Sequence, residues 1–270
     1  MNHHVKDFYK QFSEDSPKGN FHNVIALHDS PHIPWEQIHL QVPTLPRGWF
    51  ELAHLKISDR LEFTRDFWIA KLPYNPHLGD FLVNFFNSID DIQVFLVQQK
   101  IDDFYESHMV YSLKNNEGFF KGHPPAIEAS ILQMELDFPD VIFPTDYLSF
   151  LQIHDGLCKT TDCTGIYCSK IIKNKFEMLQ ASISQFGKEV TNTNGVITNP
   201  KSLIPFYESF GMPFYQCFYK DWYPENEMGN IYYSGNTNLI SDVKNLDPGS
   251  EAMAFATFSE WLIFYLETIS

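Results

Sequence analysis

The spacing of apolar residues predicts three helices in the second half of the chain. The first covers residues 126–137, where apolar side chains recur every three or four positions at Ile127, Ile131, Met134 and Phe138. The second covers residues 145–153, with Thr145 available as a cap and Gly156 just after its end. The third covers residues 171–186.

The clearest helical pattern lies near the carboxyl terminus. Thr257 and Glu260 have the spacing of a capping box. The positions that follow carry an apolar face made of Phe258, Trp261, Leu262, Tyr265 and Leu266. This pattern predicts a terminal helix that packs on the rest of the domain.

Short runs of β-branched and aromatic residues predict strands between these helices. They are bounded by Pro, Gly and Asn and cover residues 164–169, 203–207, 214–219 and 230–234. After residue 203 they lie too close together for the crossover that parallel strands require. We therefore expect an antiparallel sheet packed by helices, which is an α+β fold.

The sequence pattern in the first half of the chain predicts a smaller α+β unit. One or two helices are expected over residues 49–72, with Ser58 as a cap, and another over residues 79–88. Strands are expected over residues 92–97 and 109–113. Residues 1–45 are rich in His, Pro and Asn and are expected to form a loosely packed arm.

A segment rich in Asn, Gly and Pro, residues 114–125, is typical of a connection between packed units. We place the boundary near residue 121. The prediction is thus an accessory region over residues 1–120 and a binding domain over residues 121–270.

Charge and cysteine content narrow the function classes. The 270 residues hold 34 Asp and Glu against 19 Lys and Arg, for a net charge of −15, which disfavours binding to nucleic acid and suits a basic protein partner. Four cysteines are too few for a disulfide scaffold. No apolar run is long enough for a signal peptide or a membrane span, so a cytoplasmic protein with no membrane contact is expected.

Three segments of the second half resemble the SUKH superfamily, which includes fungal cell-wall-assembly regulators of the Smi/Knr type and bacterial immunity proteins. They are the two helices joined by Phe-Pro and Pro-x-x-Tyr over residues 127–156, the strand at residues 202–209 and the terminal helix at residues 257–269. The resemblance covers about the last 150 residues. It implies a non-enzymatic protein-binding module, either an immunity-type protein that neutralises a basic toxin such as a nuclease or a regulatory and signalling adaptor.

The candidate partner-binding residues lie in an acidic loop between two predicted strands. They are Asp221, Trp222, Tyr223, Glu225 and Glu227, to which Asp155 is added. Exposed aromatic side chains with an acidic rim are suited to a basic partner. The alternative is an ordinary hairpin loop whose Trp222 folds back on the core.

Two catalytic or metal-binding interpretations compete with this one. Cys158, His154 and Asp155 could serve a Cys/His hydrolase, although no hydrolase motif surrounds them. His154, Cys158, Cys163 and Cys168 offer zinc ligands, but their spacing differs from that of zinc ribbons and fingers. Asp90, Asp91, Asp102 and Asp103 could bind a cation but are more typical of solvated strand ends. We therefore expect no catalytic residues, no metal and no cofactor.

Overall fold

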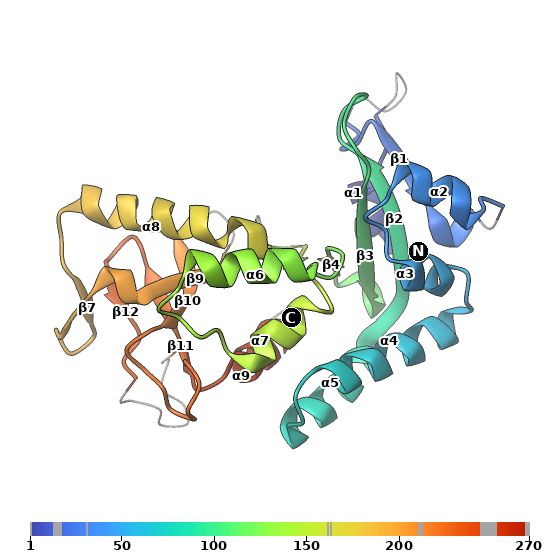
Figure 1. Cartoon of the computed structure of the whole chain (residues 1–270). Coiled ribbons are helices and arrows are strands. Elements are labelled where there is room, and N and C mark those ends of the chain that lie inside the picture. The colour runs from blue at the N-terminus through green and yellow to red at the C-terminus, as the bar shows by residue number, and fades with distance from the viewer. Residues whose placement is uncertain are drawn as a thin grey trace. The chain divides into compact units, whose positions relative to one another are not determined.

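The structure is a computed structural model, shown in Figure 1. It describes residues 2–12, 18–30, 32–160, 162, 164–209, 213–243 and 253–267. The chain forms two compact units. Unit 1 comprises residues 1–125 together with residues from 267 onward, and unit 2 comprises residues 126–266.

In the described part of unit 1, four antiparallel strands pair in the order β1-β2-β3-β4. The strands are β1 (Asn23–Ala26), β2 (Ile89–Gln98), β3 (Glu106–Leu113) and β4 (Phe119–Gly122). The α-helices are α1 (His3–Phe8), α2 (Trp35–Gln41), α3 (Arg47–Ala53), α4 (Ile57–Lys71) and α5 (Pro76–Ser88). Short 3-10 helices are η1 (Leu27–Asp29) and η2 (Lys114–Asn116). The predicted helices and strands of this half are present.

Helix α4 packs on the sheet through one row of side chains at four-residue spacing. Arg60, Thr64 and Trp68 occupy this row and are all buried. The indole nitrogen of Trp68 donates to the Tyr111 hydroxyl of β3 at 3.1 Å, and the Arg60 guanidinium lies 3.2 Å from the Asp91 carboxylate of β2. Ser58 was expected to cap this helix, but it lies inside the first turn, and Lys56 occupies the cap position.

The prediction of a loosely packed arm over residues 1–45 is wrong for the described part of that segment. Val5 and Phe21 are buried in an aromatic and aliphatic cluster on the sheet. The Asn2 amide donates to the Leu113 carbonyl at 3.1 Å, which fastens the start of the chain to β3. Prolines in this segment prevent one long helix, but they do not prevent short elements from burying apolar side chains.

Unit 2 is built on a sheet with the strand order β5-β6-β9-β10-β11-β12-β7-β8, and β13 pairs with β11. Its strands are β5 (Leu157–Lys159), β6 (Gly165–Ile166), β7 (Val190–Asn192), β8 (Ile197–Thr198), β9 (Leu203–Glu208), β10 (Phe214–Tyr219), β11 (Asn230–Ser234), β12 (Leu239–Ile240) and β13 (Ala254–Phe255). Its α-helices are α6 (Glu128–Asp137), α7 (Thr145–Leu151), α8 (Ile172–Phe186) and α9 (Phe258–Glu267). Short 3-10 helices are η3 (Ser169–Ile171) and η4 (Pro200–Ser202).

Both halves combine helices with largely antiparallel sheet, so the α+β fold class is confirmed. Within the described strands of unit 2, the pairs are antiparallel except for β12 with β7, which run parallel at one side of the sheet. The strand predicted over residues 164–169 is only two residues long, because the chain turns into η3 at Ser169.

The sheet of unit 2 is covered on both faces, since adjacent residues of a strand point to opposite sides. Helix α8 covers one face, in a cluster formed by Leu179, Ile183, Val190, Leu203, Cys217, Ile231, Tyr233, Ile240 and Ala254. Helices α7 and α9 cover the other face (Figure 1), where the Phe206 ring lies 4.3 Å from that of Phe218 and 4.8 Å from that of Trp261. The core therefore forms two layers, and aromatic rings predominate in the layer beneath α7 and α9.

The starts of the two helices on the aromatic side follow different rules. At α9 the predicted capping residue is confirmed, because the Thr257 hydroxyl accepts from the Glu260 amide at 3.1 Å. In turn, the Glu260 carboxylate accepts a hydrogen bond from the Ala256 amide at 2.9 Å. At α7 the predicted cap is wrong, because Thr145 is the first helical residue and Pro144 precedes it. The carboxylate that accepts the free amide at this helix start belongs to a loop distant in the sequence.

Candidate functional site

The predicted acidic loop is the connection between β10 and β11, residues 220–229. Two backbone bonds close its base: Tyr219 N donates to Gly229 O, and Gly229 N donates to Trp222 O, each at 2.9 Å. Asn226 adopts a left-handed conformation with φ of 62°, which Asn tolerates better than most residues. The loop is thus a defined turn set on a regular hairpin.

Trp222 folds back on unit 2 instead of pointing outward. Its side chain is half-buried and packs against the cluster beneath α8. The indole lies directly over Gly229, where a Cβ atom would come within 2.4 Å of the ring. The half-buried ring matches the alternative stated above, in which Trp222 folds back on the core, where burial of its apolar surface is favourable.

Glu227 is also engaged within the fold. Its two carboxylate oxygens accept the Thr145 amide at 3.1 Å and the Thr145 hydroxyl at 2.6 Å. A carboxylate at the amino end of a helix satisfies free amides and interacts favourably with the helix dipole. Glu227 therefore caps α7 from 82 residues away in the sequence.

The remaining three loop residues face solvent. Tyr223 keeps 49% of its surface exposed, and Asp221 and Glu225 are also exposed. Among the residues that the structure describes, their side chains have no hydrogen-bond or ion-pair partner. One aromatic ring and two carboxylates are therefore available on this loop for an external contact.

Asp155 is directed into the fold and not toward a partner. Its carboxylate accepts the Ser169 amide at 2.5 Å and the Ser169 hydroxyl at 3.1 Å. Burial raises the pKa of this carboxyl above its usual range. Asp155 thus links the segment after α7 to η3, and both of its carboxylate oxygens are engaged within the fold.

The residues of the hydrolase alternative do not form an accessible site. His154 is fully buried, so its imidazole cannot reach a substrate in solvent. Cys158 is half-buried in β5, and the Asp155 carboxylate is bonded to Ser169. Cys163 of the zinc alternative lies outside the described residues.

The acidic residues around β2 do not share one site. Asp91 is paired with Arg60, and Asp103 accepts the Lys100 amide at 3.0 Å. Within the described ranges, the side chains close enough to share a metal ion are instead Glu106, His108 and His123, all in unit 1. Sequence analysis missed this group. The available signal was the Glu-x-His alternation in a strand, which places both residues on one face.

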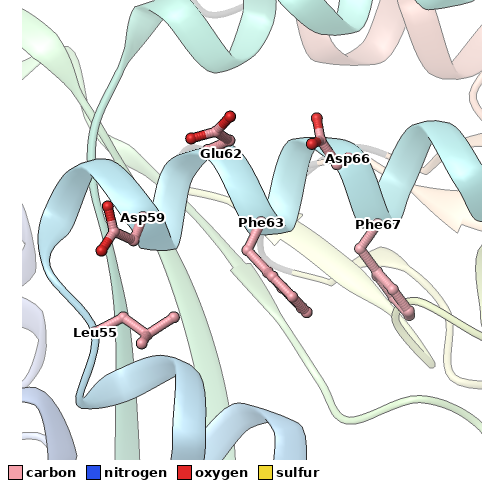
Figure 2. Close-up of a pocket in the computed structure, with 6 residues that line it drawn as sticks. All are labelled: Leu55, Asp59, Glu62, Phe63, Asp66 and Phe67. Atoms are coloured by element: carbon pink, nitrogen blue, oxygen red, sulfur yellow. The ribbon is translucent and has the colours of Figure 1, made fainter.

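A second accessible feature is a groove of about 460 Å³ along α4 in unit 1. It is lined by Leu55, Asp59, Glu62, Phe63, Asp66 and Phe67. Figure 2 shows Phe63 and Phe67 projecting from one side of the helix and Glu62 and Asp66 from another. Phe63 is 64% exposed and Phe67 is 38% exposed, whereas Arg60 of the same helix is buried. The exposed face of α4 is thus apolar and acidic.

Unit 2 contains two helices, an aromatic sheet and a capped terminal helix. These features agree with the comparison of the chain with known families. A family model described as SMI1 / KNR4 family (SUKH-1) matches residues 125–263, slightly more than half of the chain. The chain belongs to the SMI1/KNR4 family. The resemblance to SUKH proteins is therefore confirmed.

The SMI1/KNR4 match coincides closely with unit 2, and most of unit 1 lies outside it. Domains of this family are in general non-enzymatic and are of the immunity or regulatory type. A comparison with curated proteins gave no match to the chain. In the part of the chain that the structure describes, no helix is both long enough and apolar enough to cross a bilayer.

Proposed function

We propose that this SMI1/KNR4 protein binds a basic protein partner through the exposed side chains of the loop between β10 and β11. The observation that carries the proposal is that some side chains of the loop are bound to the core and others are exposed. Trp222 and Glu227 fix it to the core, while Asp221, Tyr223 and Glu225 are left exposed. A loop held in this way loses little conformational entropy on binding, so more of the contact energy appears as affinity.

The charge of the chain supports a basic partner. A net charge of −15 accelerates encounter with a positively charged protein and disfavours acidic competitors. We propose a basic toxin such as a nuclease as the partner, which gives the chain an immunity-type role. The alternative is a regulatory adaptor that uses the same surface for a basic signalling protein.

The groove along α4 is a second contact surface in this proposal. Its two exposed phenylalanines can receive apolar side chains, and Asp59, Glu62 and Asp66 lie beside them. This chemistry fits a basic amphipathic segment. Because Arg60 and Thr64 face the sheet while Phe63 and Phe67 face outward, the core of unit 1 does not account for the exposed rings.

Capture from the native organism with the full chain identifies the partner, and binding to the purified partner tests the loop. Tyr223→Ala should raise the dissociation constant at least tenfold, because a central aromatic contact typically contributes more than about 1.4 kcal/mol. Asp221→Lys with Glu225→Lys should slow association and change its salt dependence.

The matched control reverses two other exposed acidic residues of unit 2, Asp140→Lys with Glu189→Lys, so that the net charge changes equally. The control should bind more tightly than the double loop variant. Equal loss in both double variants, together with normal binding by Tyr223→Ala, would reject the loop.

Phe63→Ser with Phe67→Ser tests the α4 groove separately. Stoichiometric inhibition of the partner's enzymatic activity supports the immunity role, and unaltered activity supports the adaptor.

A further inference from the structure

Three potential metal ligands converge on one face of the unit 1 sheet. Glu106 and His108 are two residues apart in β3, so both side chains point to the same side. Strand β4 runs antiparallel to β3 with Gly122 opposite Met109, which brings the next residue, His123, beside His108. One ligand atom from each of the three lies within 4.8 Å of the others.

The central residue, His108, is buried, and its two ring nitrogens have different surroundings. The residue is 1% exposed, and its Nδ1 atom lies 3.1 Å from the Tyr9 hydroxyl. Among the described residues, its Nε2 atom makes no hydrogen bond of normal geometry, and the nearest atom of opposite charge is a Glu106 oxygen 3.5 Å away. This nitrogen is therefore available to a metal ion that draws the two groups together.

The surroundings hold His108 in the orientation that a metal ligand needs. The Tyr9 ring stacks on Phe95 at 4.0 Å, so its hydroxyl is fixed in place next to Nδ1. A histidine that ligates a metal commonly donates its other ring N–H to an oxygen, which leaves the lone pair on the ligating nitrogen. With Tyr9 as acceptor, the Nε2 atom, 3.5 Å from a Glu106 oxygen, keeps its lone pair for a metal ion.

We propose that Glu106, His108 and His123 form a three-ligand site for one divalent transition-metal ion of the zinc type. Two imidazole nitrogens and one carboxylate oxygen are a ligand set that Zn²⁺ accepts, with its fourth position left to water or to an outside ligand. Ligands about 2.0–2.2 Å from the ion lie roughly 3.4 Å apart, so a modest inward rotation of the accessible side chains completes the site. Glu106 is exposed and His123 is half-buried, so both can rotate and the ion can enter from solvent.

One positive charge lies on the same side of the sheet as the three ligands. Lys121 of β4 stands two residues before His123, so the two side chains project from the same face. The ammonium repels a cation, so its removal should tighten binding.

The experiment titrates the full, untagged, chelator-treated chain with CoCl₂ and, separately, with ZnCl₂. One Co²⁺ per chain should bind with the visible absorption of a four-coordinate site, and Zn²⁺ should displace it. Glu106→Gln and His123→Ala should each weaken binding by more than tenfold. Tyr9→Phe, which keeps the ring and removes the acceptor, should weaken binding about 10–100-fold. Lys121→Gln should strengthen it.

The matched control is His3→Ala with His4→Ala, because these neighbouring histidines could bind metal adventitiously at the surface. This variant should keep full affinity and the same spectrum. The proposal is overturned if the chain binds no stoichiometric metal. It is also overturned if His123→Ala and Glu106→Gln, made separately, both bind metal with unchanged affinity. Loss of binding in the His3 and His4 variant alone would overturn it as well. Thermal melts of each variant without metal verify folding.

Discussion

The Glu227 carboxylate satisfies both the amide and the hydroxyl of Thr145, and it does so from a loop 82 residues away in the sequence. This contact joins the loop between β10 and β11 to the start of α7. It connects the candidate binding loop to the aromatic layer of unit 2, because Tyr147 of α7 lies 4.9 Å from Phe218 of β10.

Glu227→Gln should therefore lower stability and leave the exposed face of the loop intact. Loss of a charged helix cap typically costs about 1 kcal/mol. The measurement is urea unfolding of the full chain, in which the transition midpoint of unit 2 should fall. Glu225→Gln is the control, since its carboxylate is exposed and should change stability by less than about 0.5 kcal/mol.

Trp222 and Tyr223 are neighbours with opposite expected behaviour. Trp222→Ala removes a ring that packs on the core and should lower the free energy of unfolding by about 2 kcal/mol. Gly229→Ala should destabilise by about 1–3 kcal/mol, because the new methyl group displaces the indole. Tyr223→Ala should leave the melting temperature unchanged. Unchanged stability in both Trp222→Ala and Gly229→Ala would contradict the packing of Trp222.

Asp146 should make unit 2 less stable as the pH rises through the weakly acidic range. Its carboxylate accepts the Ser259 amide at 2.7 Å and the Tyr147 amide at 2.9 Å, while burial raises its pKa above the usual value. The folded chain then holds a proton that the unfolded chain loses near pH 3.9. The free energy of unfolding therefore falls from about pH 3.9 up to the folded-state pKa.

Asp146→Asn removes this titrating group. Relative to the unmodified chain, the variant should gain stability as the pH rises through that window, which urea unfolding at several pH values measures. Asp140→Asn is a suitable control because Asp140 is exposed. A stability difference between Asp146→Asn and the unmodified chain that is constant with pH would contradict the raised pKa.

The buried pair of Arg60 and Asp91 should be costly to break on one side only. Asp91→Ala leaves the Arg60 guanidinium buried without its partner and should destabilise unit 1 by about 3–5 kcal/mol. Replacing both, Arg60→Met with Asp91→Leu, should recover most of that loss. The exposed pair of Arg47 and Glu51 is the comparison, since its removal should cost less than about 1 kcal/mol.

The sequence alone determined the α+β class, the family resemblance and most helices and strands of both halves. These features depend on periodicities that are local in the chain, such as the capped apolar face of residues 257–266 and the alternating strands around residues 214–234. Each hydrophobic face already specifies the element that buries it. The acidic loop was also visible, since its charges and aromatic rings are adjacent in sequence.

Only the tertiary structure decided which side chains of that loop are free. Local sequence cannot show that a glycine beneath Trp222 admits its ring, or that Glu227 meets a helix start 82 residues away. The packing of the described part of residues 1–45 and the meeting of His123 with Glu106 and His108 likewise depend on strand pairing. Contacts of this kind arise when buried polar groups and apolar surfaces find partners across the fold, and spacing along the chain does not encode them.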